Sequence, residues 1–267
     1  MALLPAKVWT PLSYVMILGL LAGVYWLPAD TSLREVKKAG VLRACMPPLY
    51  PPLVTGDANA PGIDVELLRA LAKELGLRFA VTSNPAMGQD FNPRNWRLTR
   101  AQCEVLGGGV VASPVTRSFL ETSPAYAETG WAFILPKPIA DVAGQRAGVL
   151  SGISGLDRIA LARYLRAKNV NVTIVTSSTD LANGLRQARF DFGVTEALAA
   201  QQIAALGGWS TQWAPAELPR FPVVLGLWKG DLTLKRAIVD GLAKLERDGE
   251  IARIIARYRG DAAPIKG

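Results

Sequence analysis

The order of strands and helices after residue 40 constrains the fold of this chain more than any other feature. Residues 40–45 (GVLRAC) read as a short apolar strand, residues 64–76 as an amphipathic helix, and residues 77–82 (LRFAVT) as a second strand. Asp64 and Gly76 are placed to cap the start and the end of that helix. A strand–helix–strand unit of this kind predicts two parallel strands joined by a right-handed crossover.

Strands and helices continue to alternate along the rest of the chain. The segment 46–53 contains four prolines, which remove backbone donors, so it must be a loop. Further strands are expected at 147–150, 170–175, 192–194 and 221–228, and further helices at 32–38, 156–167, 179–187, 232–247 and 250–258. The pattern indicates an α/β fold with parallel-rich sheets.

A separate apolar segment precedes this pattern. Residues 11–27 carry no charge, and Trp9, Tyr25 and Trp26 are placed like the aromatic belts of a membrane-spanning helix. The segment is short for a spanning helix and long for the apolar part of a signal peptide. Because no small-residue cleavage site follows, we expect residues 1–30 to be an uncleaved membrane anchor, with a cleaved signal peptide as the alternative.

Composition excludes several kinds of chemistry. The chain has no histidine and only two cysteines, so we predict no metal site and no cofactor. Cys45 and Cys103 either form one disulfide, which requires an oxidising compartment, or stay as buried thiols. The net charge of +8 is scattered without a nucleic-acid-binding motif. We therefore expect no nucleic-acid partner, and a basic surface that keeps the protein soluble or meets anionic lipid or acidic protein.

The location of the folded part is predicted from two opposing signals. More basic residues follow the apolar segment than precede it, which by the charge-bias rule would keep the rest of the chain in the cytoplasm. Long domains are exported largely regardless of flanking charge, and a cysteine pair favours export. We expect the soluble domain in the periplasm, held at the inner (cytoplasmic) membrane.

Five motifs in one order give the chain a family resemblance. They are VLRAC (41–45) with YPPL (50–53) and GIDVELL (62–68), TRSFLETSPAY (116–126), AGVLSGIS (147–154), ARFDFGVTE (188–196), and WKGD (228–231) with LERDGEI (245–251). Together they resemble the type 2 periplasmic solute-binding proteins (extracellular solute-binding protein family 3), which include the polar amino-acid-binding proteins of ABC transporters. The similarity extends over about residues 33–260.

The resemblance implies a fold of two α/β lobes joined by two crossing strands, with a ligand closed between them. Transferred to this sequence, lobe 1 comprises residues 31–133 and 221–267, and lobe 2 comprises residues 134–220. The crossings would lie near residues 133–136 and 220–223.

The resemblance also implies a set of ligand-binding residues. Arg117 would bind the ligand's α-carboxylate, which a planar guanidinium does with two charge-assisted hydrogen bonds; alternatively it pairs with Glu121 on the surface. Glu196 would bind the α-amino group, or be a solvated carboxylate at a helix start. Ser154 and the amides near Gly152 would bind the carboxylate from a helix N-terminus, or simply cap that helix.

Tyr50 completes the set, either by laying its ring over the ligand or by packing within the proline-rich loop. The sequence departs from the family pattern in three places. Ala112 stands where amino-acid-binding members usually carry serine or threonine, Leu53 stands where phenylalanine is frequent, and residues 87–103 are unusual for the family. The cysteines lie at the end of one strand and the start of another in the same lobe. If those strands are parallel neighbours, Cys45 and Cys103 come within bonding range.

Two functions follow from the resemblance. The first is a solute-binding protein that closes on an amino-acid-like anion or zwitterion for an ABC permease or a sensor. The second is a non-catalytic accessory subunit of a larger membrane or redox assembly, as in periplasmic methanol-dehydrogenase systems, with a vestigial cleft. Enzymatic activity is not expected, because the sequence leaves no room after its last helix for the transglycosylase domain that some relatives carry.

Overall fold

The computed structural model describes residues 14–19, 30–88, 92–150, 156–259 and 265. Residues 1–31 and 32–267 form two separate units. In the first unit residues 14–19 are helical and exposed, whereas the rest of the expected anchor, 11–13 and 20–27, lies outside the described residues. Among the helices of the described ranges, none combines the length and the apolar character needed to span a membrane.

The second unit contains two five-stranded sheets. The first sheet has the order β2-β1-β3-β12-β4. Its strands are β1 (Val41–Met46), β2 (Arg78–Ser83), β3 (Val105–Leu106), β4 (Leu120–Thr122) and β12 (Gly226–Trp228). The expected parallel pairing of β1 with β2 is confirmed, with register from Val41 opposite Arg78 to Met46 opposite Ser83. β3 is also parallel to β1, whereas β12 runs antiparallel to β3 and β4.

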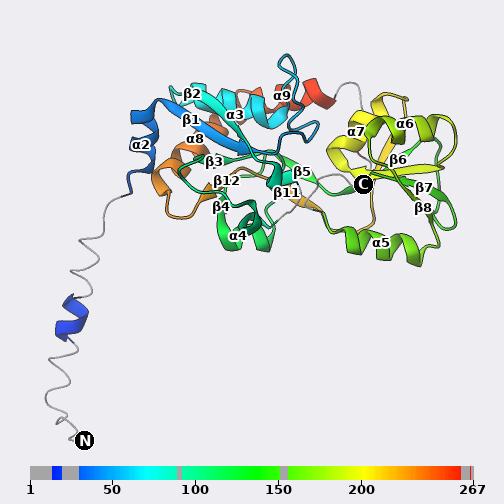
Figure 1. Ribbon diagram of the computed structural model, residues 1–267, viewed down its shortest axis with the longest axis horizontal. Helices are drawn as coiled ribbons and strands as arrows, with labels where there is room; N and C mark the ends of the chain where they lie inside the picture. The colour runs from blue at the N-terminus through cyan, green and yellow to red at the C-terminus, as the bar shows by residue number, and fades with distance from the viewer. Residues whose placement is uncertain (1–13, 20–29, 89–91, 151–155, 260–264, 266–267) are drawn as a thin grey trace, which may run out of the picture. The chain divides into compact units, whose positions relative to one another are not determined.

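The second sheet has the order β10-β6-β9-β7-β8 (Figure 1). Its strands are β6 (Trp131–Leu135), β7 (Arg146–Val149), β8 (Asn171–Ile174), β9 (Phe192–Glu196) and β10 (Ser210–Trp213). The chain passes from the first sheet to the second through β5 (Ala127–Thr129) and returns through β11 (Phe221–Val223), and these two strands pair antiparallel. The two-lobed fold is thereby established, while the exact lobe limits stay a prediction.

The prediction of parallel-rich sheets is wrong, because both sheets are mixed. β7 is parallel to β8 and β9, but β6 is antiparallel to β9 and β10. The apolar run 221–228 is also two strands in different sheets, separated at Val224 and Leu225, which bond to Val110 and Ser123. Antiparallel strands arise here because β6 and β12 enter their sheets from the crossings rather than through a helical connection.

Helices cover both faces of each sheet. Successive side chains of a strand point to opposite faces of the sheet, so apolar residues are present for packing on both. In the first sheet, Leu42 and Ala44 pack with α3 (Ile63–Glu74), α8 (Leu232–Arg247) and α9 (Glu250–Arg259). α2 (Ser32–Ala39) adds Val36 to this core. Cys45, on the opposite face, packs with Met87 of η1 (Pro85–Gly88) and Trp96 of η2 (Pro93–Trp96). α4 (Pro114–Phe119) adds Phe119 to this opposite face.

The second sheet follows the same rule. Trp131 and Phe133 of β6 pack with α5 (Arg158–Ala167), while Ala132 and Ile134 pack with α6 (Ser178–Arg186) and α7 (Ala197–Ala205). Figure 1 shows α5 on one side of this sheet and α6 and α7 on the other. The sequence analysis missed α7 and the neighbouring strands β6 and β10. β6 and most of α7 are buried, so their apolar residues show no clear period, and β10 is too short and too polar for a period to be recognised.

The start of α3 differs from the expectation that Asp64 caps it. The N-cap residue is Gly62, and the first helical amides donate to the proline-rich loop, Ile63 N to Pro52 O at 2.9 Å and Asp64 N to Leu53 O at 3.1 Å. A Cβ on Gly62 would lie 2.2 Å from the Leu53 carbonyl oxygen, so only glycine fits there. Loop carbonyls therefore satisfy the helix start, and the Asp64 side chain is free to bind elsewhere.

Candidate functional site

The carboxylate of Asp64 joins three segments of the first lobe in a buried polar cluster. Asp64 is 0% exposed, and its Oδ1 accepts a hydrogen bond from the Tyr126 hydroxyl at 2.6 Å. Its Oδ2 accepts the backbone N–H groups of Gly108 at 2.5 Å and Gly109 at 3.2 Å. Both glycines have positive φ, 78° and 90°. Asp64 therefore fixes the glycine turn that follows β3.

Tyr50 lies against the same turn. A Cβ on Gly109 would come within 2.2 Å of Tyr50 Cε1, so the absence of a side chain lets the ring approach the backbone. Tyr50 is also fixed in the proline-rich loop, because its N–H donates to Val54 O at 2.7 Å and its carbonyl accepts from Val54 N at 2.9 Å. Packing within that loop is thus present, and contact with a ligand stays a prediction.

The cluster has unusual electrostatics because it is removed from water. Burial raises the pKa of Asp64 to about 6, although the hydrogen bonds from Tyr126, Gly108 and Gly109 oppose this rise. Burial also raises the pKa of Tyr50 well above its usual value, and the charges of Glu196 and Asp64 raise it further. The Glu196 carboxylate, which comes from the second sheet, is therefore close enough to Tyr50 for its charge to be felt.

The raised pKa of Asp64 predicts a pH dependence of stability. The folded state holds the proton more tightly than the unfolded chain, so this group's contribution is fully present below its ordinary pKa of 3.8 and is lost as pH rises through about 6. The loss amounts to about 3 kcal/mol at most. We expect urea unfolding at several pH values in this range to show that the free energy of unfolding depends less on pH in Asp64→Asn than in the wild type. Asp240→Asn, at an exposed site, is the control. The assignment is wrong if the free energy of unfolding changes equally with pH in the wild type and in both variants.

Glu196 caps α7 from the end of β9. Its Oε1 accepts from Leu198 N at 3.0 Å and its Oε2 from Ala199 N at 3.0 Å, and the Thr129 hydroxyl also donates to Oε1. The carboxylate stands at a helix start, but with 3% exposure it is buried rather than solvated. Burial raises its pKa, and these three hydrogen bonds oppose the rise. Its predicted contact with an amino group stays a prediction.

Arg117 is presented to solvent by a short, well-capped helix. Ser113 caps α4 by accepting from Thr116 N at 3.1 Å, and Pro114 follows at the first helical position. Pairing of Arg117 with Glu121 is not observed, because the Glu121 carboxylate accepts from Lys235 Nζ at 2.6 Å. Among the described residues, the guanidinium of Arg117 has no hydrogen-bond or ion-pair partner, and the residue is exposed.

The three residues that follow the glycine turn, Val110 to Ala112, carry no hydroxyl group. Val110, Val111 and Ala112 are 3%, 7% and 7% exposed. Their backbone is tied to the second crossing, since Ala112 N donates to Pro222 O at 2.9 Å and Val224 N donates to Val110 O at 2.9 Å. The neighbouring hydroxyls of Ser113 and Thr116 bond to each other at 3.0 Å, within the cap of α4. These three side chains are therefore apolar and largely buried, and they provide no hydroxyl group for a ligand.

The structure describes only some of the predicted ligand residues and brings only some of those together. Gly152 and Ser154 lie outside the described residues. Tyr50 and Glu196 are brought near each other, whereas Arg117 makes no contact with either through its hydrogen bonds or ion pairs. Among the residues that the structure describes, no group of three or more histidine, cysteine, aspartate or glutamate side chains is arranged to hold a metal ion.

The two cysteines are joined in the first lobe. Cys45 and Cys103 form a disulfide that spans 58 residues, as expected from neighbouring strands. β1 and β3 are parallel neighbours, and Cys103 lies just before β3 with its Cα atom 5.7 Å from that of Cys45. Both cysteines are 0% exposed and pack with Met87, Trp96 and Trp228.

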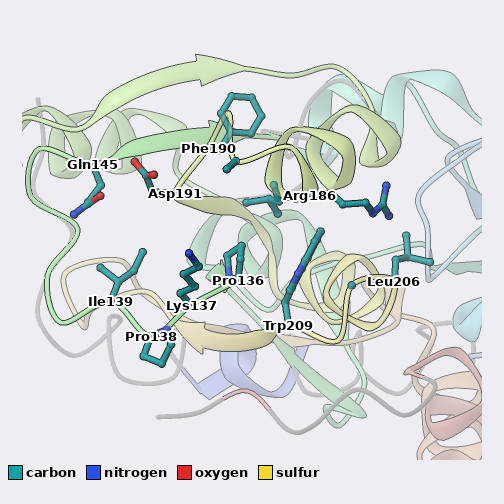
Figure 2. A pocket seen from close by; sticks show the side chains of 13 residues that line it. Pro136, Lys137, Pro138, Ile139, Gln145, Arg186, Phe190, Asp191, Leu206 and Trp209 are labelled. Carbon is teal, nitrogen blue, oxygen red and sulfur yellow. The ribbon is translucent and has the colours of Figure 1, made fainter.

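A pocket of about 790 Å³ opens in the second lobe, and Tyr50, Arg117 and Glu196 are not among the residues that line it. Its walls are the segment 136–139 on one side and Phe190 and Asp191 on the other, with Trp209 closing one end (Figure 2). Lys137 points into the space between the walls in Figure 2. The Asp191 carboxylate is paired with Arg146 at 2.7 Å, so Lys137 and Arg186 leave the lining positively charged.

Sequence reasoning missed Asp64, Tyr126 and Thr129 as members of the site. Asp64 was assigned to a helix cap, and Tyr126 was noted only as part of a motif. One chemical signal was available in the sequence. Asp64 has a carboxylate that can accept hydrogen bonds, and the three consecutive glycines Gly107 to Gly109 have backbone N–H groups that no side chain shields. Nothing in the sequence pattern indicates that Thr129 reaches Glu196.

Comparison with known proteins identifies the family. The model of bacterial extracellular solute-binding proteins, family 3, matches residues 42–261. The chain belongs to this family. The resemblance drawn from the five motifs is therefore confirmed at the level of the family and of its two-lobed fold, whereas the membrane anchor receives no support from these comparisons.

Two relatives illustrate the range of similarity. The L-cystine-binding protein TcyJ of Escherichia coli (strain K12) is 23% identical over 264 residues, which cover 92% of this chain and 93% of that protein. Membrane-bound lytic murein transglycosylase F of Erwinia tasmaniensis is 21% identical over 262 residues, which cover 93% of this chain and 51% of that protein. The chain thus spans about half the length of the transglycosylase.

Solved structures agree on the fold. An ancestral cationic amino acid solute-binding protein, AncCDT-1, superposes with a TM-score of 0.69 at 21% identity, covering 86% of this chain and 100% of that one. The structure of Tv2483 bound to L-arginine superposes with a TM-score of 0.62 at 14% identity, covering 86% and 94% of the two chains. At these identities the similarity shows the fold alone.

Proposed function

We propose that this protein binds a small amino-acid-like anion or zwitterion between its two lobes and presents it to an ABC permease or a sensor in the periplasm. The observation that carries the proposal is the Arg117 guanidinium, which is exposed, unpaired among the described residues and placed on a capped helix. A guanidinium in this state is suited to bind a carboxylate. The ligands for which the two relatives are named, cystine and cationic amino acids, belong to the same class.

The lobes would supply complementary charges to such a solute. Arg117 in lobe 1 would take the carboxylate, together with Ser154 and the amides near Gly152 from lobe 2. Glu196 would face the amino group, and the ring of Tyr50 would cover the ligand's carbon skeleton. Lobe 1 would comprise residues 31–133 and 221–267 and lobe 2 residues 134–220, with the β5–β11 pair as the hinge on which they close.

The experiment for this proposal is native mass spectrometry of the protein purified without added ligand, followed by a thermal-shift screen of the common L-amino acids. The proposed function predicts a co-purified solute or a rise in melting temperature with at least one amino acid, because a ligand that binds only the folded state stabilises it. A ligand-free protein whose melting temperature no amino acid changes would speak against it.

The tether is a second part of the proposal. Residues 11–27 are uncharged and flanked by aromatic residues, which suits an uncleaved helix in the inner membrane. We predict that the full chain sediments with washed membranes and that Leu18→Arg shifts it substantially to the soluble fraction. A charge at the centre of a spanning helix costs about 3 kcal/mol. Leu18→Ile is the matched control, and a wild-type chain that is soluble after washing would overturn the tether.

An accessory-subunit function is the second candidate, and one observation favours it. The segment Val110–Ala112 is apolar and lacks the hydroxyl expected of an amino-acid-binding member, and Glu196 already accepts three hydrogen bonds. A cleft of this kind could be vestigial in a subunit fixed to a larger membrane or redox assembly. The same native mass spectra distinguish the functions, because a stoichiometric partner subunit without solute supports the second.

A further inference from the structure

The second sheet ends in an unusually accessible edge strand. β8 pairs with β7 on one side and is the last strand of the order β10-β6-β9-β7-β8. All four residues of β8 are exposed. At the opposite edge of the sheet, by contrast, the guanidinium of Arg220 lies 4.3 Å from the ring centre of Trp213 in β10 and covers it. β8 therefore presents a free strand edge to solvent.

The backbone of β8 has donors and acceptors that point away from the sheet. Asn171 N donates to Gln145 O at 2.9 Å, and Val175 N donates to Val149 O at 3.0 Å, so these residues turn their backbone groups toward β7. In a parallel strand the direction alternates with each residue. The N–H and C=O groups of Val172 and Ile174 therefore point outward, and within the described part of the chain they have no partner.

The side chains of the same two residues are apolar and open to solvent. Val172 is 44% exposed and Ile174 is 62% exposed. They stand opposite Ala147 and Val149 of β7, which are buried in the core under α5, so they face the same side of the sheet as α5. α5 covers β7 but stops short of β8. An apolar groove of about 520 Å³ results between α5 and the edge strand.

The rim of this groove is positively charged. Arg158 and Arg166 line it from α5, together with Ala162 between them, and the described lining residues include no acidic side chain. Leu161 and Leu165, which alternate with these residues on the helix, are buried in the core. The groove therefore combines three features on one face: unpaired strand backbone, exposed apolar side chains and a guanidinium at each end.

We propose that the groove between α5 and β8 is a docking site for an extended, acidic segment of a partner protein, which adds as a strand to the edge of the second sheet. The partner's backbone would pair with Val172 and Ile174, its apolar side chains would fill the groove, and its carboxylates would meet Arg166. A second copy of this chain is a poor occupant, because it would bring the same arginines together. Lipid acyl chains provide no backbone to pair with the outward amides.

The test uses the detergent-solubilised full chain and a capped peptide of alternating glutamate and valine. Fluorescence anisotropy is expected to give a Kd below about 1 mM, with the amide hydrogens of Val172 and Ile174 exchanging at least about tenfold more slowly in the complex. A peptide with lysine in place of glutamate is expected to bind about tenfold more weakly because the Arg166 guanidinium repels it.

Two variants test the geometry. Val172→Pro removes an outward donor that β7 does not use and is tolerated at an edge strand, and Ile174→Glu places a charge in the groove. Each is expected to weaken binding of the glutamate–valine peptide about tenfold. Ile159→Glu changes an exposed α5 residue outside the groove and should leave the affinity unchanged. Equal binding of both peptides, or unchanged affinity in both groove variants, overturns the proposal. The surface binds membrane instead if the groove variants lose binding to phosphatidylglycerol vesicles while the peptide leaves the amide exchange of Val172 and Ile174 unchanged.

Discussion

Replacing Cys45 and Cys103 together by serine is expected to lower the free energy of unfolding by about 4 kcal/mol, the largest effect on stability predicted for this protein. The disulfide closes a loop of 58 residues, and the entropy of closing a loop of that length gives the estimate. Both sulfur atoms lie in an apolar core with Trp96 and Trp228, so the two serine hydroxyls are also poorly accommodated.

Urea unfolding of the oxidised wild type and of the Cys45→Ser/Cys103→Ser variant measures this difference. In a domain of this size the melting temperature should fall by roughly 10 °C. A Cys45→Ala/Cys103→Ala variant removes the bond without adding buried hydroxyls, and it separates the two contributions. Because both cysteines are fully buried, a mild reductant should leave the native wild type oxidised. Equal unfolding free energies of the wild type and both variants would show that the bond contributes nothing to stability.

The second large effect concerns ligand binding. Arg117→Ala is expected to weaken the binding of any amino acid that the protein recognises by at least about 30-fold, because a charged hydrogen-bonding partner is lost from the carboxylate. Arg117→Lys keeps the charge but not the planar fork, so an intermediate loss is expected. Arg163→Ala on α5 removes the same charge from an exposed position and serves as the control.

Isothermal titration of these variants gives the affinities directly. A melting temperature close to that of the wild type would confirm that Arg117→Ala leaves the fold intact, as expected for an exposed side chain without partners among the described residues. If Arg117→Ala and Arg163→Ala bind the same amino acid with wild-type affinity, the guanidinium does not hold the carboxylate.

Much of the fold could be predicted because local sequence signals decide it. The β1–α3–β2 unit and the terminal helices α8 and α9 appear where apolar spacing and turn residues place them. The strand at residues 221–228 was misread because an apolar run does not show which partner each half chooses. The strand expected to start at Cys103 forms as β3, Val105–Leu106, whereas β4 and β5 are below the length at which a period can be recognised.

The site was harder to predict because its contacts connect residues distant in sequence. The role of Asp64 depends on the carbonyls of Pro52 and Leu53, which satisfy the start of α3, and on amides more than forty residues away, at Gly108 and Gly109. No helix-capping rule includes such partners. Arg117 was found from its motif alone, since the helix that carries it, Pro114–Phe119, is too short to be recognised from its spacing.

The central claim is that the chain binds an amino-acid-like solute, and calorimetric titration of the ligand-free protein tests it most directly. The protein is unfolded, dialysed and refolded with its disulfide intact, and then titrated with L-cystine, L-arginine and a panel of other L-amino acids. We predict one-to-one binding of at least one of them, with a Kd in the micromolar range that rises at least about 30-fold in Arg117→Ala. No heat of binding from any amino acid, with a correctly refolded chain that still unfolds cooperatively, would contradict it.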